Sequence, residues 1–142
     1  MKKQLTIDTI EAYDTLAEEI IRTFPEGAAL LLVGPLGAGK STFAARFSAL
    51  LGHEESASPS FGILHEYSPD LIHCDLYRIG SEAFFQRGLH ESLLELPAGG
   101  FMLIEWADTR ITNWLKEEGF SCVKITLTPQ ENGSRKVEVV RA

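Results

Sequence analysis

What this sequence lacks narrows the choice of protein class. No apolar run approaches the roughly 18 residues of a membrane-spanning helix, so we expect no membrane span. No apolar segment follows Met1-Lys2-Lys3, so we expect no signal peptide and a cytoplasmic protein. The two cysteines, Cys74 and Cys122, form no CxxC pair and lie in apolar stretches. This predicts two reduced structural thiols instead of a disulfide framework.

Positive charge is also scarce. The chain has 13 Lys and Arg against 20 Asp and Glu, a net charge of −7, and no Lys/Arg cluster. A broad nucleic-acid surface would be basic, so we expect no direct nucleic-acid binding by this chain alone. No repeat, low-complexity segment or linker is present, and 142 residues suit one domain, residues 1–142, with a single core.

The most informative stretch is glycine-rich. Residues 34–42 read GPLGAGKST and fit the pattern G-x-x-x-x-G-K-[ST] of the P-loop, or Walker A motif. The apolar run 28–33 before it predicts a buried strand, and residues 43–51 after it predict a helix ending at Gly52. Strand, loop and helix are the context that marks a phosphate site. The alternative is a glycine-rich turn with a solvated lysine.

The residue types explain how such a loop would bind a nucleotide. Backbone N–H groups of residues 36–40 can surround phosphates, and the N-terminus of the following helix adds to the attraction. The three glycines allow tight turns and close approach. We expect Lys40 to reach the β- and γ-phosphates of ATP and Ser41 to ligate Mg²⁺ through its hydroxyl.

Two acidic residues end apolar runs farther along the chain. Glu105 follows the run 101–104, the form of a Walker B strand, where a carboxylate can hold Mg²⁺ or orient the attacking water. The alternative is an exposed acid at the end of an ordinary strand. Asp75 lies in a second apolar run, residues 71–77, near the expected end of a strand, and could bind Mg²⁺ directly or through water. His73 and Cys74 precede it, but adjacent strand residues face opposite sides, which argues against a shared zinc ion.

Two further features have two interpretations each. Residues 58–61, SPSF, are either an ordinary bent loop or a switch-like segment whose Ser60 hydroxyl senses the γ-phosphate or Mg²⁺. Trp106 is either a core or edge aromatic, or a lid or partner contact.

The other elements predict an α/β fold. Residues 4–7 predict an edge strand, and Asp8 with Glu11 predicts the capping box of a helix reaching Phe24. Later stretches predict a strand (61–67), a helix interrupted at Gly88 (81–96), a helix capped by Asp108 or Thr109, and an antiparallel hairpin with one wet face (123–139). The expected architecture is a P-loop NTPase-like three-layer fold with a mainly parallel central sheet and antiparallel N-terminal and C-terminal hairpin additions.

In this order, the motifs resemble those of the bacterial TsaE (formerly YjeE) proteins, small P-loop ATPase subunits of the machinery that makes threonylcarbamoyladenosine at adenosine 37 of tRNA. The P-loop resembles the family's G-D-L-G-A-G-K-T-T, and residues 58–61 its S-P-T-[FY]. Residues 73–78 (HCDLYR), 88–91 (GLHE) and 104–106 (IEW) resemble H-x-D-L-Y-R, G-[IL]-x-[ED] and V-E-W. Three residues depart from the pattern: Pro35 stands for Asp, and Ser41 and Ser60 stand for Thr but keep the hydroxyl.

The resemblance implies Mg²⁺-dependent ATP hydrolysis with TsaD-like and TsaB-like partners. The acidic balance of the chain argues against direct tRNA binding by this chain alone. It implies Lys40, Asp75 and Glu105 as catalytic residues, and Ser41 and Glu105 as Mg²⁺ ligands. The nucleotide-binding residues implied are Leu36, Gly37, Ala38, Gly39, Lys40, Ser41, Thr42, Trp106, Thr9 and Arg135.

We expect slow turnover by the chain alone, since an arginine finger can be worth about 10³–10⁵ in rate. Arg46, Arg78 and Arg110 are candidates to act in cis. Two other functions stay open: a small-molecule kinase, although no arginine-rich lid is evident, and a non-hydrolytic nucleotide-sensing binding subunit. A small GTPase would carry an [NT]-K-x-D motif, which this sequence lacks.

Overall fold

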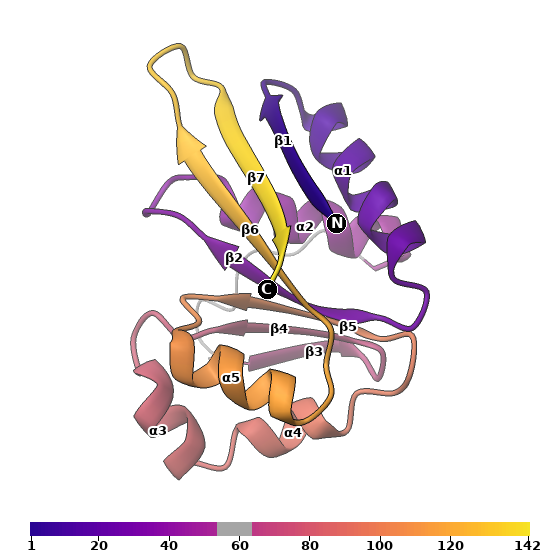
Figure 1. The fold of residues 1–142 in the computed structure, drawn as a ribbon, viewed down its shortest axis with the longest axis vertical. Coiled ribbons are helices and arrows are strands. Elements are labelled where there is room, and N and C mark those ends of the chain that lie inside the picture. The colour runs from indigo at the N-terminus through magenta and orange to yellow at the C-terminus, as the bar shows by residue number, and fades with distance from the viewer. Residues whose placement is uncertain (54–63) are drawn as a thin grey trace.

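The computed structural model describes residues 1–53 and 64–142, which form a seven-stranded sheet with helices on both faces (Figure 1). In chain order, the elements are β1 (Lys2–Ile7), α1 (Ile10–Thr23), β2 (Ala28–Val33), α2 (Lys40–Leu50), β3 (Leu64–Ser68), β4 (Leu71–Asp75), α3 (Gly80–Gln86), α4 (His90–Leu94), β5 (Phe101–Glu105), α5 (Thr109–Glu117), β6 (Cys122–Pro129) and β7 (Arg135–Arg141). None of the helices in these ranges is long and apolar enough to cross a membrane.

The strand order is β1-β7-β6-β2-β5-β4-β3. Strands β6, β2, β5 and β4 are parallel to one another, whereas β1 and β7 at one edge and β3 at the other are antiparallel to their neighbours. This confirms the predicted mainly parallel centre with antiparallel N-terminal and C-terminal additions.

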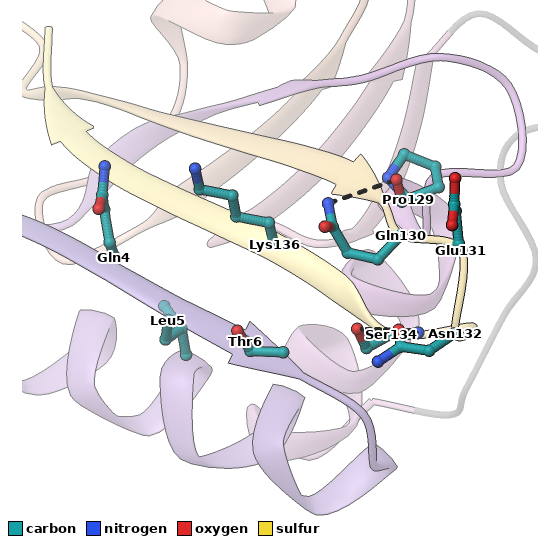
Figure 2. Close-up of a pocket in the computed structure, with 9 residues that line it drawn as sticks. All are labelled: Gln4, Leu5, Thr6, Pro129, Gln130, Glu131, Asn132, Ser134 and Lys136. Atoms are coloured by element: carbon teal, nitrogen blue, oxygen red, sulfur yellow. Dashed lines mark hydrogen bonds between the residues drawn. The ribbon is translucent and has the colours of Figure 1, made fainter.

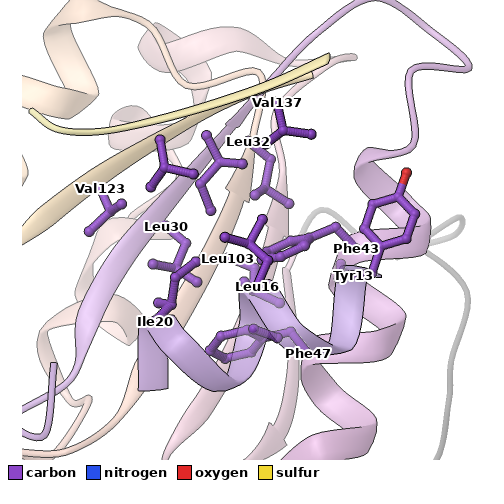
Figure 3. Close-up of a cluster of buried hydrophobic side chains, with 14 of the residues drawn as sticks. Tyr13, Leu16, Ile20, Leu30, Leu32, Phe43, Phe47, Leu103, Val123 and Val137 are labelled. Carbon is purple, nitrogen blue, oxygen red and sulfur yellow. The ribbon is translucent and has the colours of Figure 1, made fainter. Parts of the chain in front are cut away.

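Two apolar cores lie on opposite faces of the sheet. Alternate residues of β2 supply them, because successive side chains of a strand point to opposite faces: Leu30 and Leu32 join one core, and Ala29 and Leu31 the other. The first core packs α1 and α2 against the sheet, with large side chains such as Phe47 at its centre (Figure 3). The second packs α3, α4 and α5 against the other face. A strand buried on both faces has the continuous apolar sequence seen in β2.

The helix boundaries correct one prediction. Thr9, not Asp8, is the N-cap of α1: its backbone is extended (φ −135°, ψ 159°), and its side chain accepts a hydrogen bond from the Ala12 backbone N–H at 3.2 Å. Both residue types are good N-caps, so the sequence alone allowed either position. Asp108 caps α5 by accepting from the Ile111 N–H, as one of the two predicted alternatives had it. Residues 58–61 lie outside the described residues.

One edge of the sheet brings two acidic residues close to the P-loop. Asp75 ends β4 and Glu105 ends β5, and the two are register partners on adjacent parallel strands. Leu32, next to the last residue of β2, is the register partner of Glu105 on its other side. The two acidic residues therefore lie at the same sheet edge as the start of the P-loop (Gly34–Thr42), where open α/β sheets bind ligands.

Candidate functional site

The P-loop connects β2 to α2, as the sequence predicts. Gly39 is the N-cap of α2, with φ of 105°, and without a side chain it makes no cap hydrogen bond. A Cβ at Gly39 would lie 2.4 Å from the Tyr13 hydroxyl oxygen, and its φ disfavours any other residue. Uncapped N–H groups at a helix N-terminus form a ready anion site.

A hollow of about 270 Å³ opens over this loop. Its lining brings together every catalytic, nucleotide-binding and metal-binding residue that the resemblance implies, except Thr9, and adds Tyr77. The lining residues are Leu36, Gly37, Ala38, Gly39, Lys40, Ser41, Thr42, Asp75, Tyr77, Glu105, Trp106 and Arg135. We call this the P-loop hollow. Thr9 caps α1 and does not line it, so its contact with a nucleotide stays a prediction.

Lys40 is buried and turned onto its own loop. Its Nζ donates to the carbonyl oxygens of Gly34 and Pro35, at 2.5 and 3.0 Å. Burial lowers the pKa of Lys40, while the nearby Glu105 and Asp75 carboxylates oppose that shift. A phosphate entering the hollow would give this ammonium a charged acceptor in place of two neutral carbonyls, and charged acceptors form the stronger bonds.

The two acidic residues differ in environment. Glu105 is only 3% exposed, and its Oε2 lies 2.7 Å from Nε2 of the buried His73. Asp75 is partly exposed, and its Oδ1 accepts from the Tyr77 backbone N–H at 3.0 Å. With the Ser41 hydroxyl, the two carboxylates supply the oxygen donors that Mg²⁺ prefers, so the residues present fit this ion.

Trp106 is a surface residue of the hollow and not part of the core. It is 38% exposed, and its φ of 63° is uncommon for a residue other than glycine. Lys40 Nζ lies 4.5 Å from the Trp106 ring centroid, and the centroids of the Tyr77 and Trp106 rings are 4.9 Å apart. The interpretation of Trp106 as a core aromatic is therefore wrong, and those of an edge aromatic and of a lid or partner contact stay open.

Arg135 joins the C-terminal hairpin to the P-loop. From the start of β7 its Nε donates to the Ala38 carbonyl at 2.9 Å and its Nη2 to the Gly37 carbonyl at 3.2 Å. Its Nη1 donates to the Gly133 carbonyl at 2.8 Å. The guanidinium thus holds carbonyl groups of the loop on its own side of the backbone.

The remaining arginine candidates lie elsewhere. Arg46 forms a bidentate ion pair with Asp14 on α1, with N···O distances of 2.8 and 2.9 Å. Arg110 lies over the Phe85 ring, 4.7 Å from its centroid, and Arg78 is exposed. None of the three lines the P-loop hollow.

A second hollow, of about 770 Å³, lies along β1 and the turn between β6 and β7 (Figure 2). It is lined mostly by polar side chains from three strands and a turn: Gln4, Leu5, Thr6, Pro129, Gln130, Glu131, Asn132, Ser134 and Lys136. It contains none of the predicted site residues. Although it is larger than the P-loop hollow, it has neither the helix N-terminus nor the paired carboxylates, so the candidate site is the P-loop hollow.

Sequence reasoning about the site gave no role to Tyr77 and considered His73 only as a zinc ligand. A signal was available: His73 lies two residues before Asp75 in the same strand, so both face the same side of the sheet. The bond to Glu105 could not be anticipated, because it depends on β4 lying beside β5.

Comparison with known proteins finds sequence similarity to one family. The model of a family described as "Threonylcarbamoyl adenosine biosynthesis protein TsaE" matches residues 7–137. A protein of Treponema pallidum, named tRNA threonylcarbamoyladenosine biosynthesis protein TsaE, is 35% identical over 122 residues. This match covers 83% of this chain and 85% of the Treponema pallidum protein. A protein of the same name from Aquifex aeolicus is 34% identical over 112 residues, covering 75% and 77%.

A likeness to a solved structure supports the fold. The crystal structure of Bacillus subtilis YdiB superposes with a TM-score of 0.66 at 24% identity, covering 99% of this chain and 86% of that one.

Proposed function

The chain belongs to the TsaE family of threonylcarbamoyl adenosine biosynthesis proteins, and from that premise we propose that it is the Mg²⁺-dependent ATP-binding and ATP-hydrolysing subunit of the machinery that modifies adenosine 37 of tRNA. The observation that carries the proposal is the composition of the P-loop hollow. A Walker A lysine, a hydroxyl and two carboxylates from adjacent strand ends meet there.

Each residue of the hollow has a role in this proposal. The N–H groups at the start of α2 and the ammonium of Lys40 bind the phosphates. Ser41 and Glu105 would hold Mg²⁺, which when bound neutralises charge on the phosphate oxygens. Asp75, the more exposed carboxylate, assists hydrolysis by accepting a hydrogen bond from the attacking water.

The distribution of cations supports dependence on partners. All 13 Lys and Arg residues lie in the two described segments, because residues 54–63 contain none. Of these, Lys40 and Arg135 line the hollow, and Arg135 is engaged with loop carbonyls. A cation that stabilises charge on the transferring phosphoryl group is therefore left for another protein to supply. TsaD-like and TsaB-like proteins are the proposed partners.

The test is Mg²⁺-dependent ATP hydrolysis by the purified chain, alone and with the TsaD-like and TsaB-like proteins of the same organism. We expect slow turnover alone, an increase on mixing, and loss of both with Lys40→Ala. Lys136→Ala, which removes a lysine from the second hollow instead, is the matched control and should leave both rates unchanged. Turnover that is indifferent to the partners would contradict the proposed role, and phosphoryl transfer to a small acceptor would favour a kinase.

A further inference from the structure

His73 is a buried titratable group that the proposed function does not use. We infer that His73 is a positioning residue, whose Nε2–H holds the Glu105 carboxylate in the orientation in which its other oxygen serves the P-loop hollow. This inference rests on the proposed function, because it assigns Glu105 a part in binding Mg²⁺ with the nucleotide.

The position of His73 in the sheet allows this contact. His73 is the register partner of Leu103, so Glu105 lies two residues farther along β5, on the same face as the imidazole. Nε2 and Oε2 are 2.7 Å apart, and the side chains are 1% and 4% exposed. Water therefore does not compete for this bond, and a hydrogen bond to a charged acceptor in such a place is strong.

The chemistry of the pair fixes the direction of the bond. An ionised carboxylate can only accept, so the hydrogen belongs to Nε2. The other ring nitrogen, Nδ1, is buried and has no hydrogen-bond partner among the described residues. A proton placed there instead would leave a buried N–H without an acceptor and would set the Nε2 lone pair against the carboxylate oxygen, which is costly.

An aromatic ring of the neighbouring strand lies beside the imidazole. The ring of Tyr67, on β3, is nearly parallel to it, with centroids 6.5 Å apart and an interplanar angle of 18°. Three adjacent strands thus contribute in turn: Tyr67 of β3 lies beside His73 of β4, which orients Glu105 of β5. Partners that orient a metal-binding side chain in this way typically change metal affinity or activity about 10–100-fold when they are removed.

The test separates orientation from simple packing by comparing three replacements of His73. In His73→Gln the amide nitrogen can occupy the place of Nε2 and donate to Glu105. In His73→Leu no donor remains, and the shorter amide of His73→Asn cannot reach. His65→Leu, on an exposed histidine of β3, is the matched control. Thermal unfolding identifies the variants that are folded, and Gln against Asn provides the comparison if the Leu variant is not.

The readout is ATP affinity by calorimetry, measured with EDTA and with excess Mg²⁺. In His73→Leu and His73→Asn we expect the Mg²⁺-dependent gain in affinity to fall about 10–100-fold, with affinity in EDTA unchanged. His73→Gln should retain most of the gain, and His65→Leu all of it. An equal loss in the Gln and Asn variants, or none in the Leu variant, would overturn the inference.

Hydrolysis in the presence of the partner proteins is a second readout. In His73→Leu and His73→Asn the Mg²⁺ concentration for half-maximal rate should rise, with a smaller rise in His73→Gln. Absence of hydrolysis by the parent chain with its partners would contradict the proposed function, while the binding comparison would still decide whether His73 orients Glu105.

Discussion

Arg135 gives the sharpest test of how the P-loop is held in shape. The resemblance to the TsaE family implies a contact between Arg135 and the nucleotide, whereas the structure has its guanidinium donating to the carbonyls of Ala38 and Gly37. A loop whose carbonyls are engaged by a guanidinium can present its neighbouring N–H groups to an anion. Replacing Arg135 with Ala therefore removes the clamp, and replacing it with Lys keeps the charge but not the fork.

The expected magnitude follows from these two bonds. A hydrogen bond involving a charged group contributes about 1.5–3 kcal/mol, and the half-exposed position of Arg135 reduces this. We therefore expect Arg135→Ala to cost about 1–2 kcal/mol of the free energy that organises the loop. Since each 1.4 kcal/mol is tenfold in affinity, ATP affinity should fall roughly 5- to 30-fold.

The assay is ATP binding by calorimetry for the parent, Arg135→Ala and Arg135→Lys, at two salt concentrations. If the fork organises the loop, Lys should recover little of the affinity, because a single ammonium cannot bond two carbonyls in the same geometry. Arg141→Ala, an exposed arginine later in β7, is the matched control and should leave affinity unchanged. Full recovery by Lys, with a strong salt dependence, would refute the clamp and favour direct attraction between Arg135 and the phosphates.

Three further predictions concern stability and reactivity. Gly39→Ala should lower the free energy of unfolding by about 1–3 kcal/mol and weaken ATP binding. Adding Tyr13→Phe should recover only the part of the stability that is lost through the 2.4 Å approach to the Tyr13 hydroxyl, because the φ of 105° persists. Full recovery of stability in the double variant would contradict this prediction. The hydrogen bond from Arg46 lowers the pKa of Asp14, so the ion pair should stabilise the fold by about 0.5–1 kcal/mol at neutral pH and lose this contribution as pH falls below about 4. In urea unfolding, the stabilities of Asp14→Asn and the parent should therefore differ at pH 7 and converge at pH 3. A difference that stays constant with pH would refute this prediction. Burial, with a smaller effect of Asp75, raises the pKa of Cys74 to about 12. A thiol reagent at pH 8 should therefore not modify Cys74 until the chain is unfolded. Rapid labelling of Cys74 in the native protein would contradict this prediction.

The parts of the fold that the sequence predicted are those with local signals. The apolar run of β2 followed by the glycine-rich loop requires a strand, a turn and a helix in that order, and this is what forms. Glu105 was recognisable because the apolar run before it marks a buried strand with an acid at its end. The alternation in the tail similarly predicted the β6–β7 hairpin, since one face of that hairpin is buried and the other is wet.

What could not be predicted depends on contacts between distant segments. The choice between Asp8 and Thr9 as the N-cap of α1 is one of register, which two neighbouring good caps leave open. The role of Arg135 depends on β7 lying close to the P-loop, 97 residues away from Ala38 in sequence. His73 was considered only as a zinc ligand, because its partner Glu105 is 32 residues away and becomes a neighbour when β4 pairs with β5.

The charges around the P-loop hollow suggest why its backbone matters so much. In a chain of net charge −7, the hollow has Lys40 and Arg135 as cations but also Asp75 and Glu105 beside them. These charges nearly cancel, so the side chains alone give little net attraction for a nucleoside triphosphate. Under the proposed function, the attraction for ATP then depends on the N–H groups at the start of α2 and on Mg²⁺. Without Mg²⁺ the two carboxylates repel the phosphates, whereas with Mg²⁺ they can bind the ion. It follows that ATP should bind weakly in EDTA, and that Glu105→Gln should raise that Mg²⁺-free affinity while removing most of the gain from Mg²⁺.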